Sequence, residues 1–299
     1  MQKILDAGHN FLGIEKEISS FEHSKIVVLP VPYQHTVAAG YETKKAPQTI
    51  LAASHQIETF DEETKRELCK ERGIVTLAPL AFAKKTHDAA LQMIYDTVLK
   101  LVQQEKFVAT IGGDHIIATA TIAAHAKFYS NLSVLHFGAQ SHLRSHDQGD
   151  KFCNVSAMAR VCEFFDPHRL VQVGVRSQSK EEAEFIRKQG VHTFFMHEIR
   201  SGMYTKVLKY WDDFVVEALT DNVYITFDVS AFDPSIIPAV ASPEPNGLLW
   251  NETMQCFKKI IRKRRIIGFD VVELSPVKEL HYADKATAKL ISKILNYAL

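Results

Sequence analysis

Short runs of nearly continuous apolar residues alternate along this chain with longer segments in which apolar residues recur every three or four positions. The apolar runs are typical of strands with both faces covered, and they span 26–31, 107–112, 132–137, 170–175, 191–196, 222–227 and 265–272. The periodic segments predict amphipathic helices at 87–105, 179–190, 204–219, 251–264 and 284–298, with Ser179, Asn251 and Asp284 as N-caps. This alternation predicts an α/β protein with three layers, α-β-α, around a mostly parallel central sheet.

Composition sets the class of protein. The 299 residues are 46% hydrophobic and 23% charged, which is enough to bury one large core, so we expect a single domain over residues 1–299. Lys plus Arg and Asp plus Glu both count 35, so no basic field points to nucleic acid or to a membrane surface as partner. The four cysteines form no CxxC pair, and the N-terminus lacks an export signal, so we expect a cytoplasmic protein with reduced thiols.

Three polar motifs each follow a predicted strand. They are IGGDH (111–115), LHFGAQSHLR (135–144) and TFDVSAFDPS (226–235). Because parallel strands present their carboxyl ends at one edge of a sheet, segments that are distant in sequence meet there in one crevice. We therefore expect the three segments to line one cavity.

The order and spacing of these motifs, together with ASPEPNGL (241–248), resemble the ureohydrolase family, which includes arginases, agmatinases and formiminoglutamases. The resemblance covers nearly the whole chain. It extends from LPVPYQHTVAAG near the start, with Pro47 where a helix begins, to VVELSP (271–276) near the end, and it is closer to bacterial agmatinases than to arginases. It implies the arginase/deacetylase-like fold.

The resemblance also implies a site, in which two Mn²⁺ ions share a bridging water and six side chains bind them. At the six matching positions this chain has His115, Gly138, Gln140, His142, Asp228 and Ser230. Glycine offers no ligand, and the amide and the hydroxyl are neutral, weak donors for two closely spaced cations. His115, His142 and Asp228 are the remaining competent ligands, and we do not expect a manganese pair.

Two further positions are implied to contact a substrate. Asn154 stands where the family has a histidine that is proposed to shuttle protons, and asparagine exchanges no proton near neutral pH. Glu244 matches a family glutamate that pairs with the substrate guanidinium. Glu273, at the end of a predicted buried strand, is expected to pair with a pocket residue or to form a structural ion pair.

Three other histidines lie near the motifs but match no implied ligand. They are His125, His136 and His146, and we interpret them as structural or surface residues.

Three functions remain open. In the first, no cofactor is bound, Asp228 is hydrogen-bonded to His142 or His115, and the protein is a non-catalytic binding or regulatory subunit for a small cationic guanidino or amine ligand. In the second, His115, His142 and Asp228 hold one divalent metal (Zn, Fe, Ni or Mn), and the protein hydrolyses C–N bonds in linear amidines such as agmatine-like substrates. We favour the first, while an agmatinase with a displaced metal set fits the residues least well. The family also implies a homo-oligomer, trimeric or hexameric, or a hetero-oligomer with an active paralogue.

Overall fold

The structure is a computed structural model that describes residues 3–35, 41–205 and 209–299. Within these residues eight strands form one sheet, in the order β2-β1-β3-β8-β7-β4-β5-β6, and every pair of neighbours is parallel. The strands are β1 (Ile26–Val31), β2 (Ile74–Thr76), β3 (Phe107–Gly112), β4 (Leu132–Phe137), β5 (Leu170–Val175), β6 (His192–Phe195), β7 (Asn222–Asp228) and β8 (Arg265–Val272).

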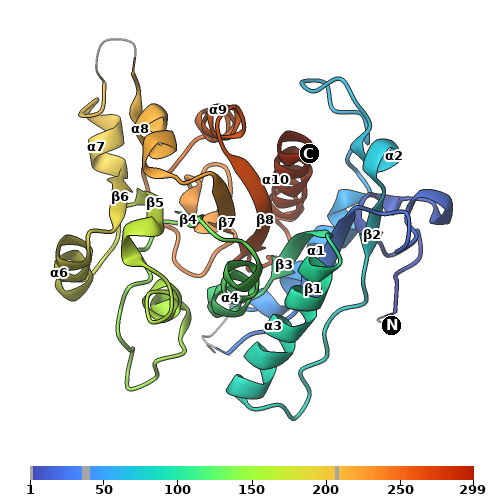
Figure 1. Ribbon diagram of the computed structural model, residues 1–299, viewed down its shortest axis with the longest axis horizontal. Coiled ribbons are helices and arrows are strands. Elements are labelled where there is room, and N and C mark those ends of the chain that lie inside the picture. The colour runs from blue at the N-terminus through green and yellow to red at the C-terminus, as the bar shows by residue number, and fades with distance from the viewer. Residues whose placement is uncertain (1–2, 36–40, 206–208) are drawn as a thin grey trace.

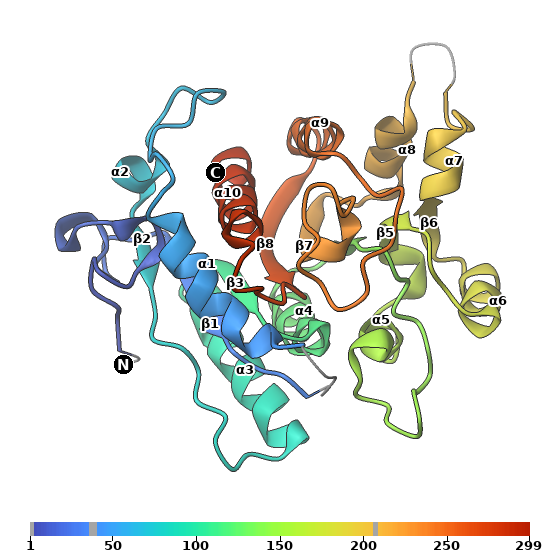
Figure 2. The same ribbon diagram turned by 180° about the vertical axis from the view of Figure 1, so that it is seen from behind.

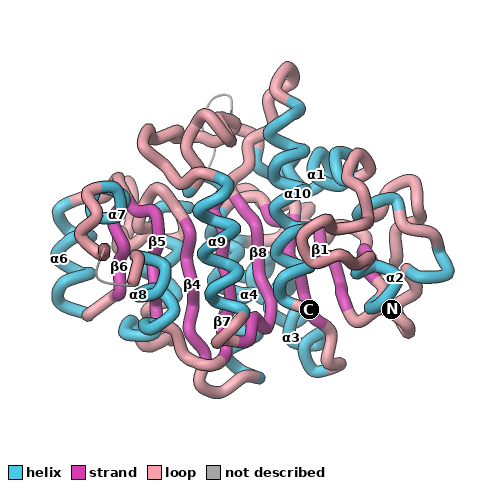
Figure 3. Tube along the Cα trace, turned by 90° about the horizontal axis from the view of Figure 1, so that it is seen from above, coloured by secondary structure: helices cyan, strands magenta, loops and turns pink. Residues whose placement is uncertain are grey.

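Helices cover both faces of this sheet (Figures 1 and 2). One layer holds α1 (Ala46–Ser54), α8 (Trp211–Ala218), α9 (Trp250–Ile261) and α10 (His281–Ala298), whose apolar residues share one core with the sheet. The other layer holds α3 (His87–Gln103), α4 (Ala118–Phe128), α5 (Ala157–Val161) and α6 (Lys180–Gln189), packed on a second core. Figure 3 shows the sheet between the two layers. The short α2 (Leu68–Arg72) and α7 (Met196–Arg200) complete the α-helices of the described residues.

Most of the predicted elements are present, and the errors have physical causes. All seven predicted strands exist. The eighth strand, β2, was not predicted, because three residues are too few to show a hydrophobic pattern. The segment expected to be helical over 204–219 is helical only from Trp211, and 206–208 lie outside the described residues. The helix of residues 118–128 was missed because most of its residues are buried, which leaves no polar face to give a period of 3.6.

One of the three predicted N-caps is confirmed. The Ser179 side chain accepts a hydrogen bond from the backbone of Glu182, and Gly190 ends α6 in the left-handed conformation. Asn251 and Asp284 are not caps, because α9 and α10 begin one turn or less before them, after Leu249 and Leu280. Pro47 lies in the first turn of α1, as expected.

The four central strands are β3, β8, β7 and β4, in that order across the sheet. The three motifs follow β3, β4 and β7, and VVELSP follows β8, so all four polar segments leave neighbouring strands at one edge. The fold therefore brings them together in the middle of the sheet, far from its open ends.

No helix among the described residues is long and apolar enough to cross a membrane.

Candidate functional site

His115, His142 and Asp228 meet at the carboxyl end of the central strands. Asp228 is the last residue of β7, and its Oδ2 lies 3.1 Å from Nε2 of His142 and 3.8 Å from Nδ1 of His115. All three side chains are buried. The predicted convergence is therefore observed, and so is the expected hydrogen bond between Asp228 and His142.

In each histidine, the ring nitrogen that faces away from Asp228 lies within hydrogen-bond distance of another oxygen. His115 Nε2 lies 2.9 Å from Oγ1 of Thr226, which donates its own proton to Asp270 at 2.6 Å. The Thr226 oxygen is thus the acceptor for His115, and the Nδ1 lone pair faces Asp228 without a hydrogen-bond partner among the described residues. His142 Nδ1 lies 2.5 Å from the carbonyl oxygen of Asn154, so both its ring nitrogens face oxygen atoms.

Burial and neighbouring imidazoles set the charges at this site. Burial lowers the pKa of His115 to about 4, and the adjacent His142 adds to that shift. Burial alone would raise the pKa of Asp228, but the imidazoles of His115 and His142 outweigh it and hold the pKa well below its usual range. The site therefore contains a charged carboxylate beside a neutral His115.

A cavity of about 180 Å³ opens above these residues. Its lining includes His142, Asn154, Asp228, Ser230 and Glu273. Glu273 accepts a hydrogen bond from the backbone N–H of His115 at 2.5 Å, and burial raises the pKa of its carboxyl to about 8. The expected pairing of Glu273 with a pocket residue is thus a bond to backbone, and no ion pair to it is found among the described residues.

Glu244 is not among the described residues that line this cavity. It lies half-buried in the loop after β7, and that loop is held by Arg176, a residue that the sequence did not single out. The Arg176 guanidinium donates to the backbone carbonyls of Ser230 at 2.9 Å, Glu244 at 2.8 Å and Pro245 at 3.0 Å. The acidic side chain that the structure places in the pocket beside Asp228 is therefore Glu273.

The remaining implied ligand positions carry weak or no donors. The Ser230 hydroxyl accepts from the backbone N–H of Ala139 at 3.2 Å and lies 3.4 Å from Oε1 of Gln140, whose amide nitrogen is 3.4 Å from the carbonyl of Ser242. Gly138 has no side chain. With Asp228 as the only carboxylate among the six positions, this donor set does not fit two divalent cations.

Gly138 leaves room for His136, which the sequence led us to interpret as a structural or surface residue. A Cβ at residue 138 would lie 2.6 Å from Nε2 of His136, which is fully buried. The side-chain nitrogens of His115, His136 and His142 lie within 4.8 Å of one another. One signal could have found His136, because residues 136 and 138 are two apart and so lie on the same side of the strand end.

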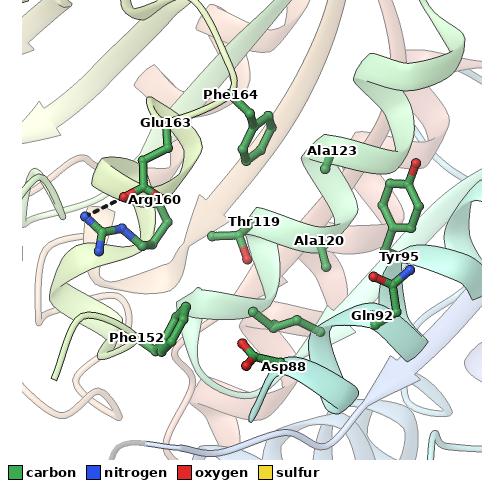
Figure 4. A pocket seen from close by; sticks show the side chains of 11 residues that line it. Asp88, Gln92, Tyr95, Thr119, Ala120, Ala123, Phe152, Arg160, Glu163 and Phe164 are labelled. Carbon is green, nitrogen blue, oxygen red and sulfur yellow. Dashed lines mark ion pairs between the residues drawn. The ribbon is translucent and has the colours of Figure 1, made fainter.

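A second cavity, of about 330 Å³, lies between α3, α4 and α5 (Figure 4). Thr119 and Ala120 come from α4, and Phe152 and Phe164 close one side. Its charged groups are Asp88 and the ion pair of Arg160 with Glu163, at 3.2 Å. None of the residues implied as ligands lines it.

A sequence model of the arginase family matches residues 24–299. The chain belongs to the arginase family. Among relatives, the N(1)-aminopropylagmatine ureohydrolase of Synechocystis sp. is 31% identical over 285 residues, which cover 94% of this chain and 91% of the relative. The agmatinase of Bacillus cereus is 27% identical, over 88% of this chain and 87% of the relative.

The fold of this arginase-family chain matches solved structures. The agmatine ureohydrolase of Thermoplasma volcanium superimposes with a TM-score of 0.82 at 23% identity, covering 100% of this chain and 94% of that chain. The proclavaminate amidinohydrolase of Streptomyces clavuligerus gives a TM-score of 0.80 at 21% identity, covering 91% of both chains. The predicted α/β three-layer fold is thereby confirmed.

Proposed function

We propose that this arginase-family protein binds a small cationic guanidino or amine ligand without releasing urea, and acts as a non-catalytic binding or regulatory subunit. The observation that carries this proposal is the position of His136, whose imidazole lies where a side chain of residue 138 would begin. A carboxylate at this position is needed to hold two cations around a shared water. Asn154, in the pocket wall, also supplies no group that exchanges a proton near neutral pH.

The chemistry of the pocket supports a cationic ligand. Glu273 and Asp228 line the same cavity, while burial disfavours the charged form of Glu273 until a cation compensates it. A guanidinium or ammonium group placed beside Glu273 would stabilise the ionised carboxylate by a charge-assisted hydrogen bond. The names of the relatives, agmatinase and N(1)-aminopropylagmatine ureohydrolase, point to the same class of ligand.

A regulatory role also requires a partner. We propose that the chain assembles into a homo-oligomer, trimeric or hexameric, or into a hetero-oligomer with an active paralogue. Purification from the native source, followed by measurement of the particle mass and identification of every subunit, distinguishes these arrangements. A monomer of uniform mass would contradict the regulatory part of the proposal.

Ligand binding and urea release test the proposal together. Agmatine, N(1)-aminopropylagmatine and arginine are titrated into the protein by calorimetry, and urea is assayed after incubation with Mn²⁺. We expect one of these cations to bind, to bind at least about tenfold more weakly to Glu273→Gln, and to yield no urea. Glu181→Gln is the control, since that exposed side chain lies outside the lining of the cavity. Urea release by the Mn²⁺-treated protein would overturn the proposal.

A second candidate function is the hydrolysis of a C–N bond in a linear amidine at one divalent metal. It is favoured by the free Nδ1 of His115 and by the orientation of His142 Nε2 toward Asp228. Two imidazoles and one carboxylate are a donor set that fits one Zn²⁺, Fe²⁺, Ni²⁺ or Mn²⁺, and both imidazoles have the backing hydrogen bonds that metal-binding histidines need. When bound, such a metal polarises the substrate or lowers the pKa of a water.

Metal analysis separates the two candidates. About one equivalent of metal that is retained after dialysis and lost in His142→Ala supports the second function, and less than about a tenth of an equivalent supports the first.

Restoring the family set provides a further test: Gly138→Asp, Gln140→His, His142→Asp and Ser230→Asp together are expected to regain Mn²⁺, provided that His136→Ala removes the side chain against residue 138. Turnover would in addition need Asn154→His.

A further inference from the structure

The cavity of about 330 Å³ between α3, α4 and α5 shares no lining residue with the pocket around Asp228. The segment between β4 and α5 separates the two spaces, since Phe152 lines the cavity and Asn154, two residues later, lines the pocket. The cavity is the larger of the two, and its volume is in the range of sites that hold small organic molecules. It is therefore a separate space in which a second ligand fits.

The lining of this cavity is mostly apolar (Figure 4). Ala120 and Ala123 of α4 form its floor, between the side chains of α3 and those of the segments on either side of α5. Two aromatic rings, Phe152 and Phe164, lie on the side of α5. The side chain of Phe164 is 50% exposed, so a ligand that covers its ring would remove apolar surface from water.

The charged groups of the cavity leave one carboxylate without a partner. The Arg160 guanidinium lies 3.2 Å from a carboxylate oxygen of Glu163 and donates to the carbonyl of Lys151 at 3.4 Å, so the charges of Arg160 and Glu163 offset each other. Asp88 lies in the first turn of α3, and none of the ion pairs found among the described residues involves it. A negative charge beside an apolar wall is the complement of an organic cation.

We propose that the cavity between α3, α4 and α5 binds a small amine with an apolar body, whose ammonium group pairs with Asp88 while its body covers Phe152 and Phe164. The ammonium group donates a charge-assisted hydrogen bond to the carboxylate, and the body displaces water from the rings. An uncharged molecule of the same shape makes only the second of these interactions. The site lies outside the pocket and does not depend on the function proposed for it.

The test uses 2-phenylethylamine as the probe, titrated into the protein by calorimetry, with 2-phenylethanol as its uncharged counterpart. We expect saturable binding of the amine and roughly tenfold weaker binding of the alcohol. Asp88→Asn, which keeps the size of the side chain and removes its charge, is expected to bind the amine roughly tenfold more weakly. Glu181→Gln, which removes an exposed carboxylate outside the lining of both spaces, is the matched control and should keep the affinity.

A second variant tests the location by shape alone. Ala123→Leu places a larger apolar side chain on the floor of the cavity and changes no charge. It is expected to weaken binding of the amine at least about tenfold, because the new side chain takes up the space of the ligand's body. Cooperative unfolding in urea verifies that the variant is folded, and unchanged affinity in the folded variant would place the amine elsewhere.

The probe is a cation, so its binding has to be distinguished from binding in the pocket. Affinity that is lost in Asp88→Asn and retained in Glu273→Gln assigns the amine to the cavity, whereas the reverse assigns it to the pocket and overturns the proposal. Equal affinity for amine and alcohol would also overturn it. So would the lack of saturable binding, which is the result expected if a second copy of the chain covers the cavity. Binding of agmatine tests the pocket independently of these results.

Discussion

Gly138 shows how the lack of one side chain reshapes a whole site. Its backbone lies against the ring of His136, so the position tolerates no Cβ without a shift of several tenths of an ångström. His136 in turn is fixed by Gln172, its partner on β5. The residues that differ from the implied ligand set are thus packed against one another and support one arrangement of the pocket floor.

Gly138→Ala is therefore expected to lower the free energy of unfolding by about 1–3 kcal/mol, because the new methyl group meets a buried ring. Urea denaturation measures the change. Gly8→Ala, where the nearest atom is an Asp6 carboxylate oxygen at 3.4 Å, is the control and should change stability by less than about 0.5 kcal/mol. In the double variant with His136→Ala the loss should not be additive, and additive losses would show that the two residues do not compete for space.

Burial of the Glu273 carboxyl makes the stability of the protein depend on pH. Its folded-state pKa is raised to about 8 by burial, so its contribution to stability is fully present at acidic pH and is lost as the pH rises toward 8. Glu273→Gln should be more stable than the unaltered protein at pH 9, with the difference shrinking toward pH 5. Unfolding curves at both pH values measure this. A difference that is the same at both would show that the carboxyl is not buried in solution.

At the level of elements, the loop that follows β7 depends on a single side chain from the end of β5. Arg176 donates hydrogen bonds to carbonyls at both ends of that loop, including Ser230 and Glu244. Phe232 also pairs with Leu248, which closes the loop at its base. The wall of the pocket formed by residues 240–242 is held in place through these contacts.

Arg176→Met is expected to destabilise the protein by roughly 2–4 kcal/mol, because several partly buried carbonyls lose a charged donor at once. Hydrogen exchange should become faster at the amides of Asp233 and Leu248, which bond across the base of the loop. Arg169→Met, which removes an exposed guanidinium 4.0 Å from Asp166, serves as the comparison and should leave those amides unchanged. Equal protection in both variants would show that Arg176 does not hold the loop.

At the scale of the whole molecule, buried histidines inside and outside the site make stability depend on pH. Burial lowers the pKa of His115, at the pocket floor, and of His125, in α4, to about 4 in each case. Because the unfolded chain titrates near pH 6.5, it binds more protons than the folded chain between about pH 6.5 and 4. Each of these histidines therefore costs stability as the pH falls through this window.

The penalty for His125→Phe should accordingly shrink as the pH falls from 7 to 4.5, by up to roughly 3 kcal/mol, since the variant has no buried imidazole to protonate. Chemical denaturation at the two pH values gives the comparison. The sign is opposite to that expected for Glu273→Gln, so the pair of variants checks the direction of both shifts. A penalty that grows at acidic pH would refute the assignment.

The sequence predicted the central strands well because each is buried over nearly its whole length and is mostly apolar, as in β4 and β8. It also predicted that His115, His142 and Asp228 would meet, since parallel strands fix which ends lie together. It did not predict the role of Arg176, whose acceptors are backbone carbonyls that any residue supplies. Nor did it reveal His136. The imidazole of that residue fits beside the site only because Gly138 has no side chain.

His142 and Glu273 both have a left-handed backbone, with φ of 54° and 69°. For residues other than glycine this conformation costs on the order of 1 kcal/mol or more, and glycine would avoid that cost. Two adjoining walls of the pocket thus retain a histidine and a glutamate where the backbone alone would favour the smallest residue. Glycine at either position would relieve that backbone cost, but it would remove the imidazole or the carboxyl that lines the pocket.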